Sequence, residues 1–183
     1  MSKFISVECF ADKYFFSKLM GSEYINKQAN KPKAIANILR NSHKFEVGII
    51  DEDKVKLKDN KQIKNQKVEF EWIIQNDYFE VGRIKDKNQV FIQLIPEFEP
   101  WISKILENYF NTNIQDFGFA NLKDFNSIKG INQDKDKRFV SLVKFILENY
   151  NTTDNPVRKL KQILDEIQTN PYNIDKQKIT DFI

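Results

Sequence analysis

The spacing of apolar residues changes along this chain from a strand pattern to a helical pattern, and this change divides the sequence into two parts. Over roughly the first 100 residues, short apolar runs alternate with amphipathic stretches. The pattern predicts strands at 3–10, 24–27 and 45–54, and helices at 12–21 and 30–41. The order strand, helix, strand, helix, strand predicts right-handed crossovers and a mainly parallel sheet flanked by helices.

The middle of the chain has a less regular pattern. Residues 54–67 are polar and are expected to form an exposed loop, whereas VEFEWIIQ at 68–75 fits either a strand or a helix. YFEVGRI at 78–84 and QVFIQLI at 89–95 are strand candidates, and the turn-like KDKN joins them. Pro96 is expected to end the second of these strands.

From Glu97 onward apolar residues recur at spacings of three and four, which predicts helices in 101–109, 139–150 and 157–167. Residues 111–135 contain no Gly/Ser-rich linker. We therefore expect an α/β domain over 1–110 and a helical extension over 111–183 that packs on it. The aromatic residues of the extension lie at helical spacing and are expected in the core.

Composition narrows the class of protein. Hydrophobic residues make up 40% of the chain and charged residues 30%, which is typical of a globular protein. The formal net charge of +3 does not indicate a nucleic-acid binder, so any basic surface must be local. The one cysteine cannot form an intramolecular disulfide, and no run approaches the ~20 apolar residues of a membrane span. We expect a cytoplasmic protein without a membrane partner.

Carboxylates follow two of the predicted buried strands. Glu8 ends the first strand and Asp12 stands four residues beyond it, whereas Asp51 and Asp53 lie at the end of the third. Because the carboxyl ends of parallel strands meet at one edge of a sheet, these four side chains are expected to converge there. Repulsion between them is relieved by protonation, by a Lys or Arg partner, or by a cation. With one His and one Cys in the chain, oxygen ligands favour Mg²⁺ or Mn²⁺ over Zn²⁺.

These residues resemble the motifs of the Toprim domain. Glu8-Cys9-Phe10-Ala11-Asp12 resembles the VEGxxD opening of the OLD-like nuclease branch, and IIDEDK at 49–54 resembles its Asp-x-Asp motif. The similarity covers about the first 100 residues. It departs from the family at Cys9, where Gly is frequent and where a side chain crowds an approaching phosphate.

The resemblance implies a mainly parallel Toprim-like sheet and a nuclease that uses Mg²⁺ or Mn²⁺ to hydrolyse phosphodiesters in DNA or RNA. Glu8 would be the general acid or base and a metal ligand, and Asp12, Asp51 and Asp53 would hold the metal. At 183 residues, the chain is expected to lack strand-passage and priming modules, and a minimal nuclease fits this length best. Small Toprim-like proteins also resemble effectors of bacterial antiphage defence. A regulatory protein partner and a homo-oligomer both remain open.

Lysines follow the Asp-x-Asp motif. Lys54 stands next to Asp53 and is expected to neutralise the scissile phosphate. Lys56, Lys58 and Lys61 make a local basic loop that suits sequence-independent contacts with a nucleic-acid backbone. The alternative for this loop is a solvated segment without a ligand.

Other interpretations of these residues remain open. The acids also fit simple strand ends and helix caps, and Glu97 and Glu99 fit either an added metal ligand or the start of a helix. His43 is expected on the surface, and Cys9 is expected to be a small buried hydrophobe rather than a nucleophile.

Two other functions compete with the nuclease. One is a catalytically silent Toprim-like binding or regulatory module, whose helical part would contact the partner. The other is a haloacid-dehalogenase-like phosphatase, because VGIIDEDKV also resembles that family's opening motif, with Asp51 as nucleophile and Asp53 as acid and base. That family needs a later strand that ends in Ser or Thr, and none is found after residue 55.

Overall fold

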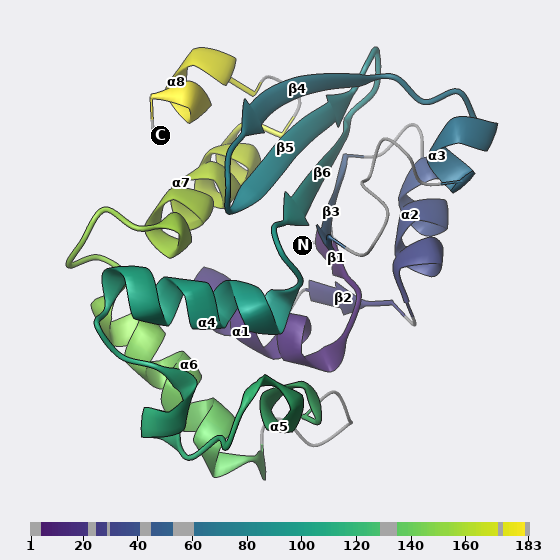
Figure 1. Ribbon diagram of the computed structural model, residues 1–183. Helices are drawn as coiled ribbons and strands as arrows, with labels where there is room; N and C mark the ends of the chain where they lie inside the picture. The colour runs from purple at the N-terminus through teal and green to yellow at the C-terminus, as the bar shows by residue number, and fades with distance from the viewer. Residues whose placement is uncertain are drawn as a thin grey trace.

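A six-stranded mixed sheet forms the centre of the molecule, with the strand order β2-β1-β3-β6-β5-β4 (Figure 1). The computed structural model describes residues 5–21, 25–28, 30–40, 45–52, 61–128, 135–171 and 174–181, without the side chains of residues 61, 62 and 176. The strands are β1 (Ile5–Val7), β2 (Ile25–Lys27), β3 (Glu46–Asp51), β4 (Phe70–Gln75), β5 (Phe79–Ile84) and β6 (Gln89–Leu94).

Helices flank the sheet. They are α1 (Phe10–Met20), α2 (Lys31–Arg40), α3 (Lys61–Asn65), α4 (Phe98–Tyr109), α5 (Leu122–Asn126), α6 (Lys137–Asn149), α7 (Pro156–Thr169) and α8 (Lys176–Thr180), with a short 3-10 helix, η2, at Ile114–Phe117. None of the described helices is both long enough and apolar enough to cross a membrane.

Strand pairing confirms a mostly parallel sheet. β2, β1, β3 and β6 run parallel, whereas β5 and β4 join the edge as antiparallel strands. From β1 the chain moves outward to β2 and then returns past β1 to β3. The direction of strand addition therefore reverses between β1 and β3, and this place is the topological switch point of the sheet.

The larger core lies between one face of the sheet and helices α1, α4, α6 and α7. Val47, Ile49 and Ile92 contribute side chains from the sheet, and Phe15 and Trp101 contribute side chains from α1 and α4. The ring centroids of Phe15 and Trp101 lie 6.1 Å apart in an edge-on contact. Residues of α6 and α7 belong to the same apolar cluster, so these helices pack directly with the layer that covers the sheet.

The smaller core lies on the opposite face, under α2 and α3. It contains Ile35 and Ile38 from α2 together with Ile50 and Phe91 from the sheet. Gly48 permits the close approach of these elements, because a Cβ at this position would lie 2.9 Å from Cδ1 of Phe91 and still closer to Ile38. Residues alternate between the two cores along β3, as expected for a strand covered on both faces.

Most predicted elements are confirmed, and the differences are local. The first strand ends earlier than expected, at Val7, because a capping box between Cys9 and Asp12 starts α1 at Phe10. Residues 68–75 contain strand β4, and α3 begins inside the stretch expected to be a loop. The five-residue helices α5 and α8 were not expected, since so short a stretch shows no periodicity.

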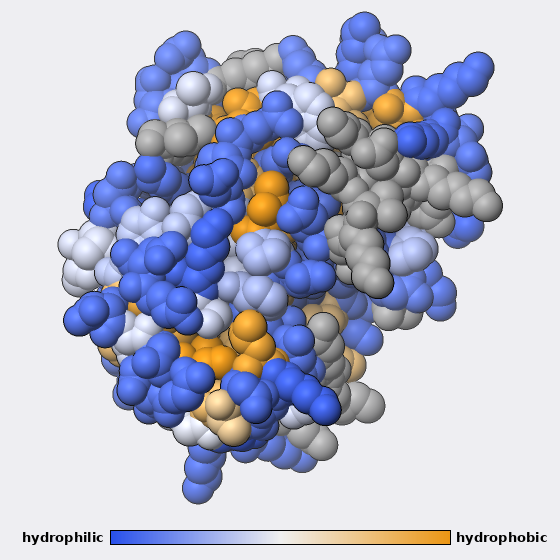
Figure 2. Space-filling view, in the orientation of Figure 1, coloured by the Kyte–Doolittle hydropathy of each residue, from blue (hydrophilic) through white to orange (hydrophobic). Residues whose placement is uncertain are grey.

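The visible surface is mainly polar. In the face shown in Figure 2, apolar side chains appear only in small, separate patches between polar ones. Among the described residues, Leu122 is the one large hydrophobic side chain in the exposed class, with 39% of its surface accessible.

Candidate functional site

The candidate site lies at the topological switch point, where β1 and β3 end. Glu8 directly follows β1, and Asp51 is the last residue of β3. The backbone N–H of Asp51 donates a hydrogen bond to Oε1 of Glu8 over 3.0 Å. Two acidic residues 43 positions apart are thus brought together at the edge where open α/β sheets bind their ligands.

The side chain of Asp51 connects this edge to helix α4. Its Oδ1 accepts a hydrogen bond of 3.1 Å from the backbone N–H of Phe98, the first residue of that helix. The N-terminal N–H groups of a helix have no partner within the helix, and a carboxylate there also interacts favourably with the helix dipole. Asp51 therefore helps to fix the start of α4 beside the switch point.

Asp12 lies at the start of α1 and is buried, with 3% of its surface exposed. Its Oδ2 accepts the backbone N–H of Cys9 over 2.9 Å, and the N–H of Asp12 in turn donates to Sγ of Cys9 over 3.5 Å. This reciprocal pair is a capping box with a thiol in the place of the usual hydroxyl. Asp12 has a structural role as a cap, whatever further role it has.

Lys31 is a site residue that the sequence analysis missed. It is the first residue of α2, only 4% of its surface is exposed, and its Nζ donates a hydrogen bond to the backbone carbonyl of Asp51. A buried ammonium is costly unless it is partnered. The sequence held one signal for this role. Lys31 stands just before Pro32 at the start of a predicted helix, where the helix dipole disfavours a positive charge, so the cation is expected to have a specific partner.

Glu99 adds a further buried carboxylate near these residues. It lies in the first turn of α4 with 2% of its surface exposed, whereas Glu97 is the N-cap of that helix and makes no side-chain capping bond. Both residues therefore occur at a helix start, as one of the two interpretations expected. A role of either residue as a metal ligand stays a prediction.

The thiol of Cys9 is a poor nucleophile in this setting. Burial raises its pKa well above the usual range, and the negative charges of Asp12 and Glu99 add to the shift. Because the thiolate is the reactive form, a raised pKa suppresses nucleophilic chemistry. Cys9 packs at the margin of the larger core, in agreement with its interpretation as a small hydrophobe.

The remaining predicted site residues are not all described by the structure. Asp53, Lys54, Lys56 and Lys58, and also His43, lie outside the described residues. Lys61 begins α3, but its side chain is not described. Only the first acid of the Asp-x-Asp motif is therefore located in the site.

Within the described part of the chain, no group of three or more His, Cys, Asp or Glu side chains is arranged to hold a metal ion. The juxtaposed acids Glu8 and Asp51 still offer the hard oxygen donors that Mg²⁺ and Mn²⁺ prefer. A complete ligand set would require Asp53 in addition.

Comparison of the chain with protein-family models, with curated proteins and with solved structures gives no match. The geometry of the site is therefore the basis for the function considered next.

Proposed function

We propose that the protein is a Mg²⁺- or Mn²⁺-dependent nuclease with a Toprim-like domain, and that its active site lies at the switch point between β1 and β3. The observation that carries this proposal is the hydrogen bond between Glu8 and the backbone of Asp51 at that point. The parallel order β2-β1-β3-β6 supports it, because it brings the ends of β1 and β3 side by side.

The donor set suits the chemistry of a hard divalent cation. Glu8, Asp51 and Asp53 would hold the metal, which when bound lowers the pKa of a coordinated water and stabilises charge on a phosphodiester. Glu8 would also accept and return a proton during hydrolysis. Each carboxylate has two oxygens, so it can accept a backbone N–H and bind a metal at the same time.

Lys31 brings a positive charge to the end of β3. Its ammonium is held on the carbonyl of Asp51, so it places a positive charge beside the negatively charged strand ends. Lys54 would contact the scissile phosphate, and Lys56, Lys58 and Lys61 would contact the backbone of the nucleic acid. The substrate would be DNA or RNA, and these lysines would hold its backbone independently of sequence. A role in antiphage defence would rest on analogy with small Toprim-like proteins.

The test is cleavage of plasmid DNA, single-stranded DNA and total tRNA by the purified protein with Mn²⁺. Glu8→Gln and Asp51→Asn should each abolish cleavage. Glu46→Gln is the matched control, because Glu46 lies at the other end of the same strand β3, away from the site. This variant should cleave as the wild type does. Calorimetry with Mn²⁺ gives a second readout, and absence of both cleavage and metal binding would refute the proposal.

A second candidate is a binding or regulatory module without catalysis. The observation that favours it is that Glu8, Asp12 and Asp51 each accept a backbone N–H, which is a structural task. A regulatory protein or a second copy of the chain would then be the partner. Biological activity that is lost in Asp51→Asn, in a protein that cleaves no substrate, would favour this module over the nuclease.

The phosphatase alternative uses the same residues differently, with Asp51 as nucleophile. It predicts hydrolysis of small phosphate monoesters, which the same protein preparation can be assayed for. The end of β6 at Leu94, followed by Ile95 and Pro96, offers this chemistry no Ser or Thr.

A further inference from the structure

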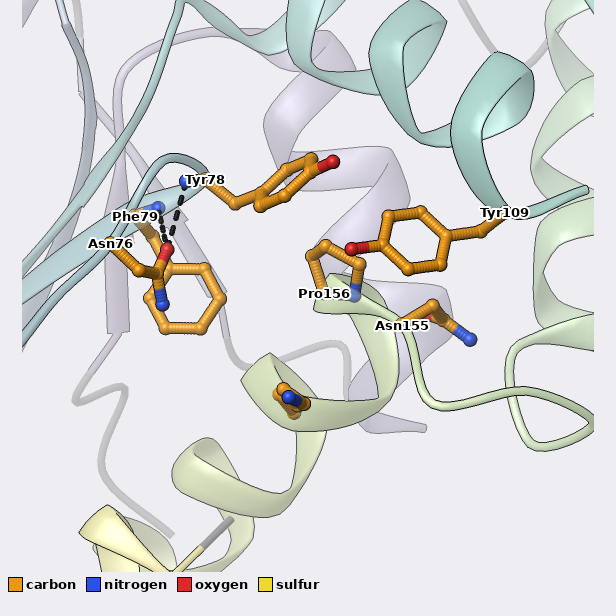
Figure 3. A pocket seen from close by; sticks show the side chains of 7 residues that line it. Asn76, Tyr78, Phe79, Tyr109, Asn155 and Pro156 are labelled. Atoms are coloured by element: carbon orange, nitrogen blue, oxygen red, sulfur yellow. Dashed lines mark hydrogen bonds between the residues drawn. The ribbon is translucent and has the colours of Figure 1, made fainter. Parts of the chain in front are cut away.

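A small cavity opens on the same edge of the sheet as the candidate site, between the β4–β5 turn, the end of α4 and the start of α7 (Figure 3). Its volume is about 130 Å³. It is lined by Asn76, Tyr78, Phe79, Tyr109, Asn155, Pro156 and Lys159.

Two tyrosines form the walls of this cavity, and they are held in place. The ring centroids of Tyr78 and Tyr109 lie 5.7 Å apart at an interplanar angle of 65°. The ammonium of Lys104 lies 4.2 Å from the centroid of Tyr78, and Nδ2 of Asn108 donates to the Tyr78 hydroxyl over 3.0 Å. These contacts lower the conformational entropy that the rings would lose on binding a ligand.

The backbone around the cavity is fixed as well. Oδ1 of Asn76 accepts the N–H groups of Tyr78 and Phe79 over 2.8 and 2.9 Å, which closes the turn seen in Figure 3. On the other side, Oδ1 of Asn155 caps α7 by accepting the N–H of Val157 over 3.0 Å. The cavity is thus preformed, as small-molecule and base-binding pockets generally are.

A positive charge lies at the rim. Nζ of Lys159 lies 3.2 Å from Oδ2 of Asp154, whose side chain is 73% exposed. The Lys159 side chain is only 18% exposed, whereas Asp154 extends into solvent, so a phosphate that arrives from solvent competes with this carboxylate for the ammonium. Lys104 supplies a second ammonium beside Tyr78.

The position of the cavity suits a substrate that also reaches the acids. Asp51 pairs with Leu94, and Leu94 pairs with Phe79, so the acid and the cavity wall lie in one row across the sheet. Helix α4 joins the two places, because Phe98 at its start contacts Asp51 and Tyr109 at its end lines the cavity. At ~1.5 Å per residue, Phe98 and Tyr109 lie roughly 16 Å apart along the helix. A few nucleotides of an extended strand span this distance.

We infer that the cavity holds one unstacked pyrimidine base of a single-stranded nucleic acid, with Lys159 on the adjacent phosphate; this inference rests on the proposed nuclease function. The volume favours a small base, since about 130 Å³ is close to the roughly 150 Å³ of a protein cavity that holds a benzene ring. One six-membered ring matches this space better than the two fused rings of a purine. Aromatic walls beside lysines are the usual means of binding single strands.

The test is the binding of fluorescein-labelled (dT)6 and (dA)6, measured by anisotropy in EDTA so that no cleavage is involved. We expect (dT)6 to bind more tightly than (dA)6. Tyr109→Ala should weaken (dT)6 at least about five-fold, as loss of one stacking contact does, whereas Tyr109→Phe should stay close to the wild type. Lys159→Gln should weaken binding and lower the slope of log K against log salt by about 1.

Lys161→Gln is the matched control, because Lys161 lies on the same helix and pairs with an aspartate, Asp165, but does not line the cavity. Its binding should be unchanged. Equal effects of Lys159→Gln and Lys161→Gln, equal affinity for the two oligonucleotides, or no binding of (dT)6 would each overturn the inference. If circular dichroism shows that Tyr109→Ala does not fold, the comparison of Lys159→Gln with Lys161→Gln tests the inference.

The two proposals fail in different ways. If cleavage depends on Glu8 but substitutions of Tyr109 and Lys159 leave the affinity for (dT)6 unchanged, the base pocket is refuted and the nuclease proposal is not. Pocket-dependent binding of (dT)6 without cleavage or Mn²⁺ binding would support the pocket and refute the nuclease.

Discussion

Asp12 offers a way to separate a helix cap from a metal ligand. In Asp12→Ala, the N–H of Cys9 loses the acceptor that now lies 2.9 Å away, in a position where Asp12 itself is 3% exposed. A hydrogen bond to a charged group contributes about 1.5–3 kcal/mol, and loss of an N-terminal cap costs about 1 kcal/mol. We therefore expect the free energy of unfolding to fall by about 2 kcal/mol, which lowers the melting temperature by roughly 4–8 °C in a chain of this size.

Asp12→Asn is the informative partner of this substitution. The amide oxygen of Asn still accepts the N–H of Cys9, so at least half of the lost stability should return. An uncharged amide is a much weaker ligand for Mg²⁺ or Mn²⁺ than a carboxylate. If Asp12 is a metal ligand, Asp12→Asn will be stable but will bind Mn²⁺ and cleave substrate poorly; if Asp12 is only a cap, stability and cleavage will recover together.

The measurements are urea unfolding followed by tryptophan fluorescence, and calorimetry with Mn²⁺ on the same preparations. Unfolding curves of the wild type and Asp12→Ala that coincide would show that the capping box contributes nothing, and the reasoning above would be wrong. Cys9→Ala tests the reciprocal half of the box, since it removes the sulfur that accepts the N–H of Asp12.

Three further predictions concern the frame of the site and of the cavity. Gly48→Ala should lower the free energy of unfolding by about 1–3 kcal/mol in urea titrations, because its Cβ would overlap Phe91 in the smaller core; a more stable variant would contradict the packing. The pKa of Tyr109 is raised to about 12, by burial first and then by its hydrogen bond to Tyr78. The raised value stabilises the folded protein fully below pH 10, and this contribution is lost as the pH rises toward 12; ultraviolet titration of Tyr109→Phe should lack the last phenol to ionise. A hydrogen bond from Arg138 is the main cause that lowers the pKa of Asp136. This stabilisation is present above the normal Asp pKa and is lost as the pH falls through the lowered value, so melting temperatures of Arg138→Gln should depend less on pH below about 4 than those of the wild type.

The candidate site was predictable in part. The acids at the ends of β1 and β3 followed from buried apolar runs that end in carboxylates, because residues beyond a strand end lie at the sheet edge. Lys31 was not predicted in the site, and for Glu99 the sequence left a metal ligand and a helix start equally open. Charged residues are usually exposed, and burial of a particular one depends on which elements cover it in three dimensions.

Strand β4 shows why part of the fold stayed ambiguous. The run Trp72-Ile73-Ile74 breaks the alternation of a strand, and the structure has a register shift between Trp72 and Ile74. The shift lets both isoleucines pack with the larger core while Trp72 packs with the smaller one. Such a β-bulge is set by pairing with the neighbouring strand β5, which the local sequence does not describe.

The sequence by itself determined the elements whose patterns are long or sharply bounded, such as α4, α6, α7 and the hairpin of β5 and β6, because helix and strand periodicity and turn residues act over a few neighbouring positions. The tertiary structure alone decided the meeting of Glu8 with Asp51, the burial of Lys31 and the cavity between Tyr78, Tyr109 and Lys159. Each of these joins segments distant in the chain, and their contacts depend on strand order and on the packing of helices over the sheet.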